Sequence, residues 1–82
     1  NTYMSASKIN KLRVEHQSYY ESAEYAGYMA GKSKGKKRNE FEDEENHYLE
    51  ICDDIAGKIL KLKPSKYMLN KYPELQDILE SI

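Results

Sequence analysis

The sequence predicts an all-α fold, an antiparallel helical hairpin closed by one or two short C-terminal helices. Two observations support this. Apolar residues recur at alternating spacings of three and four along two long segments, residues 5–31 and 40–62, and no stretch of β-branched residues alternates with a period of two. The 82 residues, 1–82, are expected to form one helical domain, near the size at which a single core is only just sufficient.

The first segment predicts a helix from about Ser5 to about Gly31, with Ser5 or Ser7 as its N-cap. Its apolar positions form a seam for packing at a shallow angle against a second helix. The seam consists of Ile9, Leu12, His16, Tyr19, Ala23, Ala26 and Ala30. Because its later residues are small, we expect the second helix to approach closely there.

Gly31 and Gly35 enclose Lys-Ser-Lys, which predicts a loop over residues 32–38. The second helix is expected to start after Asn39, since Asn39 and Glu42 match a capping box, and to end before Pro64. Its apolar stripe consists of Phe41, Tyr48, Leu49, Cys52, Ile55, Ala56, Ile59, Leu60 and Leu62.

A final short helix is expected from Pro73, a residue well suited to a first helical position. Leu75, Ile78, Leu79 and Ile82 would then share one apolar face. The apolar stripes of the two long helices have more surface than this short helix can cover. We therefore expect the chain to form a homo-oligomer, a dimeric helical bundle.

Composition excludes several classes of function. No apolar run approaches the roughly 20 residues of a membrane span, so no membrane partner is expected. No secretion signal is recognisable, and the single Cys52 fits a reducing compartment; we expect a cytoplasmic protein. The sequence has no Ser/His/Asp arrangement, phosphate-binding glycine loop or paired-cysteine motif, so no catalytic residue, metal or cofactor is expected.

Charges are arranged in blocks along the chain. The basic run contains Lys32, Lys34, Lys36, Lys37 and Arg38, with no acid among them. At the C-terminal end of the first helix these cations would complement the helix dipole. The alternative is that they bind phosphate, which would make the protein an RNA-binding or ribosome-binding module.

Eight acids follow the basic run within residues 39–54. The first of these acids is Glu40. Within the same block, Glu44 and His47 form an E-x-x-H pair of the kind found in di-iron helical bundles. The acidic block could form a metal site or mimic the charge of a nucleic acid. We interpret the block instead as the solvated start of the second helix, where acids favour the dipole.

Two tetrapeptides, Glu21-x-x-Glu24 and Glu50-x-x-Asp53, resemble the carboxylate motif of the MazG type of all-α nucleotide pyrophosphohydrolase. The resemblance implies that these four side chains would hold Mg²⁺ for hydrolysis of a nucleoside triphosphate. A shorter stretch, Tyr25 to Lys34, is similar to the glycine-rich segment of ribosome modulation factors, and Asn39-Glu40-Phe41 stands near that family's Asn-Pro-Tyr. It lacks the family's tryptophans.

The eight tyrosines favour a binding function, because Tyr provides a large contact area at low entropic cost. We interpret the chain as a non-enzymatic interaction protein, a small regulator or inhibitor of a host or regulatory protein. Such proteins are common among phages and mobile elements, an analogy only. The expected surface combines Tyr20, Tyr25 and Tyr28 with the basic run or with the helix start that contains Glu40 and Glu44.

Overall fold

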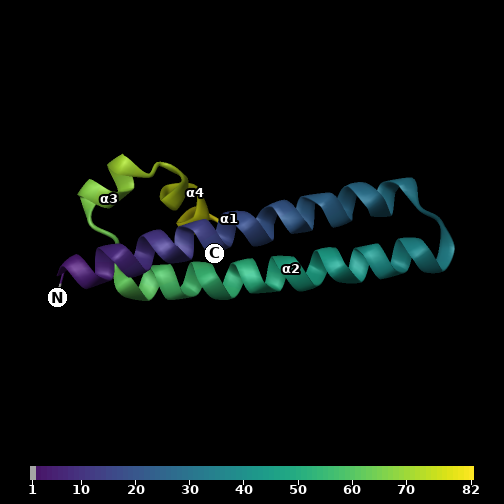
Figure 1. Cartoon of the computed structure of the whole chain (residues 1–82), viewed down its shortest axis with the longest axis horizontal. Helices are drawn as coiled ribbons and strands as arrows, with labels where there is room; N and C mark the ends of the chain where they lie inside the picture. The colour runs from purple at the N-terminus through teal and green to yellow at the C-terminus, as the bar shows by residue number, and fades with distance from the viewer. Residues whose placement is uncertain (1) are drawn as a thin grey trace.

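The computed structural model describes the backbone of residues 2–82 and the side chains of residues 5–82. Four helices follow one another: α1 (Thr2–Lys32), α2 (Gly35–Leu62), α3 (Lys66–Lys71) and α4 (Glu74–Glu80). Figure 1 shows α1 and α2 side by side and antiparallel, with α3 and α4 against one end of the pair. The predicted helical hairpin is confirmed.

The predicted seam of α1 faces α2. Ile9, Ala23, Ala26 and Ala30 are buried, and Leu12 and His16 are half-buried. Close packing along the small-residue part is visible at Gly27, where an added Cβ would meet the side chain of Glu45 on α2. The predicted cap at Ser5 or Ser7 is wrong, because α1 is already helical from Thr2.

The apolar stripe of α2 is buried in its second half. Cys52, Ile55, Ala56 and Ile59 are buried, whereas Leu49 and Leu60, at the sides of the stripe, are exposed. The helix ends at Leu62, as predicted, because Lys63 adopts a left-handed conformation (φ 52°) and Pro64 follows it.

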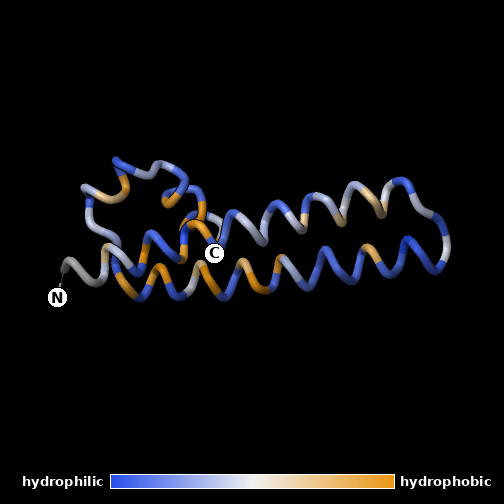
Figure 2. Tube along the Cα trace, viewed as in Figure 1, coloured by the Kyte–Doolittle hydropathy of each residue, from blue (hydrophilic) through white to orange (hydrophobic). Residues whose placement is uncertain are grey.

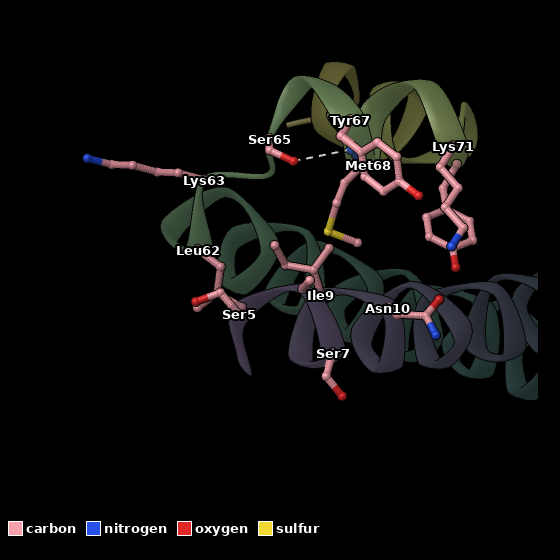
Figure 3. A pocket seen from close by; sticks show the side chains of 12 residues that line it. Ser5, Ser7, Ile9, Asn10, Leu62, Lys63, Ser65, Tyr67, Met68 and Lys71 are labelled. Carbon is pink, nitrogen blue, oxygen red and sulfur yellow. Dashed lines mark hydrogen bonds between the residues drawn. The ribbon is translucent and has the colours of Figure 1, made fainter. Parts of the chain in front are cut away.

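The two short helices cap the core at this end. Ser65 is the N-cap of α3, and its hydroxyl accepts a hydrogen bond from the Met68 amide at 3.2 Å (Figure 3). The Met68 side chain reaches Ile9 of α1. In α4, Leu75 and Ile78 are buried and Leu79 is half-buried, whereas Ile82 lies beyond the helix and is exposed.

Arg13 fastens the C-terminal helices to α1. Its guanidinium donates to the Glu74 carboxylate at 2.7 Å and lies 4.1 Å from the centre of the Tyr72 ring. A second bond, to the Asn10 side chain at 2.7 Å, orients the guanidinium. None of the helices formed by residues 2–82 combines the length and apolarity needed to cross a bilayer.

Candidate binding surface

The hairpin is divided into a covered end and a free arm, which we define as residues 21–48. Figure 1 shows α3 and α4 over the end that contains the start of α1, while the rest of the hairpin extends beyond them in a molecule 50 Å long and 18 Å wide. Apolar residues gather at the covered end, and the arm is mainly hydrophilic (Figure 2). A binding surface on the arm is therefore not occupied by the chain's own C-terminal helices.

The three predicted tyrosines are all exposed: 48% for Tyr20, 62% for Tyr25 and 58% for Tyr28. Their phenol rings contribute little to the core. Tyr28 instead stacks with a cation, since the Lys32 ammonium lies 4.7 Å from the centre of its ring.

Tyr20 and Tyr25 line different hollows. Tyr20 lines an open hollow of about 440 Å³ beside α4, together with Leu49 of α2 and Ile78 of α4. Tyr25 lines another, of about 430 Å³, with Tyr48 and Glu44 of α2. The predicted surface is thus divided between two hollows. Sequence reasoning did not include Tyr48 and Leu49 in a site, although both were placed on the stripe of α2.

The predicted loop over residues 32–38 is wrong. Only Ser33 and Lys34 connect the helices, because α1 ends at Lys32 and α2 starts at Gly35, whose φ of 62° suits glycine. The Ser33 hydroxyl donates to the Met29 carbonyl at 2.8 Å and so closes the last turn of α1. Asn39 lies inside α2, and the predicted capping box at Asn39 is wrong as well.

Because α2 begins at Gly35, most of the basic run lies at the start of α2 and not at the end of α1. Lys36, Lys37 and Arg38 lie at the N-terminal end of α2, where cations oppose the helix dipole. The N-cap Lys34 provides no side-chain hydrogen bond, and the first turn contains no acid. All five residues of the basic run are exposed at the tip of the hairpin. Lys32 lies in the last turn of α1 and favours the dipole of that helix, but helix electrostatics do not explain Lys36, Lys37 and Arg38.

The acidic block also lies away from the helix start. Glu40 and Glu44 are exposed and lie more than one turn into α2, where the effect of the dipole has largely decayed. Our interpretation of the block as the solvated start of the helix is wrong for this reason.

The carboxylates of the MazG-like motif are not gathered into one site. Glu21 lines the hollow that contains Tyr25, whereas Asp53 lines the hollow that contains Tyr20. Glu24 and Glu50 are exposed. Among the side chains of residues 5–82, no three His, Cys, Asp or Glu groups lie close enough together to hold a metal ion. The segment similar to ribosome modulation factors spans the end of α1 and the connection.

His16 and Cys52 form the boundary between the arm and the core. The Cys52 thiol donates to the His16 carbonyl oxygen at 3.7 Å, and the His16 ring stacks on Tyr20 at 6.3 Å between centroids. Burial raises the pKa of Cys52, with a smaller contribution from the charge of Asp53. The thiol therefore remains protonated and packs as a small apolar group.

The comparisons with known proteins complete the description. No family model, no curated protein and no solved structure matches the chain.

Proposed function

We propose that the protein is a non-enzymatic regulator or inhibitor whose free arm docks on another protein. The observation that carries this proposal is the exposure of Tyr25 and Tyr28 on a part of the hairpin that no other element covers. Tyrosine combines a large apolar ring with a polar hydroxyl and is enriched where proteins bind one another. The free Cys52 favours a reducing, cytoplasmic location for this function.

A tagged pull-down from lysate of the native host tests the proposal when run with and without nuclease. We expect a discrete protein that is retained after nuclease treatment and is lost with Tyr25→Ala/Tyr28→Ala. Tyr67→Ala is the control, because Tyr67 is equally exposed but lies on α3. The free energy of unfolding of the double variant should lie within about 0.5 kcal/mol of the wild-type value, as is typical of surface positions.

Two results would contradict the proposal. Unfolding of the double variant would show that the tyrosines belong to the core. Capture only of RNA and ribosomal proteins, lost with nuclease, would instead indicate a nucleic-acid function for the basic run at the tip.

We further propose that the protein forms a homodimer. Val14, Leu60 and Ile82 leave apolar side chains exposed outside the arm, and a core of this size gains stability from association. The mass in solution, measured by light scattering over a concentration series, should approach twice 9.6 kDa. A mass that stays at the monomer value throughout would refute the homodimer.

A further inference from the structure

A groove opens at the covered end of the hairpin, between the start of α1 and α3. Its volume is about 920 Å³, within the range of about 300–1,000 Å³ that is typical of sites for small molecules. Apolar residues form its floor: Ile9 and Met68 are buried, and Ala6 and Leu62 are half-buried. Figure 3 shows the Met68 side chain reaching from α3 toward Ile9 across this floor. The accessible surface of the groove is mainly apolar, which suits the apolar part of a small molecule.

The charged side chains that line the groove are all cations. They are Lys63 and Lys71, and no Asp or Glu of the described chain lines it. Figure 3 shows Lys63 directed away from the groove, whereas Lys71 descends from the end of α3 at its rim. Neither of the ion pairs formed among the side chains of residues 5–82 involves Lys71. One positive charge is therefore available to a ligand at the rim.

Two tyrosines position this charge. The Lys71 ammonium lies 5.8 Å from the centre of the Tyr67 ring and 5.5 Å from the centre of the Tyr72 ring, both within the range of cation–π attraction. The Tyr72 ring is itself held by the Arg13 guanidinium, 4.1 Å from its centre. Lys71 is thus placed at the rim before a ligand arrives, which lowers the entropic cost of binding an anion there.

The other polar groups of the groove are able to donate hydrogen bonds to an anion. The Asn10 side-chain oxygen accepts from the Arg13 guanidinium at 3.2 and 2.7 Å, so its amide nitrogen is the part of the side chain that can bind a ligand. Ser5, Ser65 and Tyr67 add hydroxyl groups, each with one hydrogen to donate. A cation and several donors beside an apolar floor match a molecule with an apolar body and an anionic head.

We infer that this groove binds a free fatty acid, with the carboxylate on the Lys71 ammonium and the apolar chain along the floor formed by Ile9 and Met68. One cation at the rim matches the single negative charge of a carboxylate better than the charge of about −1.5 to −2 on a phosphate group. The groove lies at the covered end, outside the free arm. This inference therefore goes beyond the proposed function and does not depend on it.

Titration of the intact, isotope-labelled chain with octanoate, followed by NMR and by calorimetry, tests this inference. Octan-1-ol and octylammonium are the matched probes, because they keep the apolar chain and change only the head group. We expect saturable binding of one octanoate per chain, with the largest amide shifts around Ile9 and Met68. The other two probes should bind about fivefold more weakly or less, because they lack the charge-assisted contact with Lys71.

Lys71→Met removes the charge and keeps an unbranched side chain. It should weaken octanoate binding by about fivefold and leave octan-1-ol binding unchanged, which also shows that the variant is folded. The control is Lys66→Met, which removes the same charge from an exposed position of α3 that does not line the groove, and it should bind octanoate as the wild type does.

Four results would overturn the inference. They are the absence of saturable octanoate binding, equal binding of the three probes, equal weakening by the two lysine variants, and tighter binding of octyl phosphate than of octanoate. The largest amide shifts must also lie at the groove. If they lie instead in the hollow beside Tyr20, the assignment of the site is wrong.

Discussion

His16 is the one histidine in the seam of α1. Burial lowers its pKa from the ordinary value of 6.5, and the nearby charge of Asp53 offsets part of that effect. The folded protein therefore holds the ring neutral more strongly than the unfolded chain does. Its position was evident from the helical periodicity, and its stacking on Tyr20 follows from a spacing of four residues on one helix. Only the contact of its carbonyl oxygen with Cys52 depends on helix pairing.

This pKa predicts a pH dependence of stability. Because the unfolded chain takes up the proton more readily, the free energy of unfolding should be highest above pH 6.5 and should decrease as the pH falls below it. Urea unfolding of the wild type between pH 7.5 and pH 5.5, about one pH unit either side of the ordinary histidine pKa, would measure the decrease. His16→Gln should flatten the profile.

His47→Gln is the matched control, since His47 is exposed on α2. If it flattens the profile as much as His16→Gln does, the assignment to His16 is wrong.

Arg13 shows what residue patterns could not predict. Its partner Glu74 lies 61 positions away, and neither residue belongs to an apolar period. The seam, by contrast, was predictable because burial on a helix follows the spacing of three and four. Contacts of polar side chains between distant elements require the tertiary arrangement.

At the scale of the elements, the start of α2 is where prediction failed. Asn39 and Glu42 match a capping box, yet α2 begins five residues earlier than that box predicts, at Gly35. Gly35 allows that earlier start, and each extra helical residue adds a backbone hydrogen bond. The extra turns at the start of α2 also pack against the last turns of α1, where Ala30 is buried.

The absent cap at the start of α2 makes a prediction about stability. Lys34→Asp would supply a side-chain acceptor for the first amides and a charge that favours the dipole. It should raise the free energy of unfolding by about 1 kcal/mol.

Lys58→Asp makes the same charge change at an exposed position in the interior of α2 and should give no such gain. The two variants can be compared by thermal unfolding at one pH. Equal effects would show that net charge, not capping, governs the stability of this helix.

At the scale of the whole molecule, the hairpin has a packed end and an arm that α3 and α4 leave uncovered. The core lies where α3 and α4 meet the hairpin, around Ile59 and Leu75, which are fully buried. The free arm depends on a narrow seam of small residues and carries charges that oppose its own helices. This contrast supports the proposal that a partner covers the arm.

The overall architecture was predictable because two long helical periods joined by a short glycine-containing segment leave few alternatives to a hairpin. The acidic band, by which we mean the eleven Asp and Glu residues from Glu15 to Asp54, was not predicted as one feature. Its members are separated in sequence, with Glu21 and Glu24 far from Glu44, and only antiparallel pairing brings them to the same level of the hairpin.

The central claim is that the hairpin exposes a surface for a partner and that the acidic band does not hold the fold together. Its most direct test is the free energy of unfolding of Glu50→Gln/Asp54→Asn at low ionic strength, compared with Asp77→Asn/Glu80→Gln. We predict that neutralising the band stabilises the protein by a few tenths of a kcal/mol, about the size of one repulsive pair. The control should give little net change, because Asp77 lies in the first turn of α4 and favours its dipole, whereas Glu80 is the last residue of α4 and opposes it. A loss of stability on neutralising Glu50 and Asp54 would contradict the claim, since those carboxylates would then be holding the hairpin together.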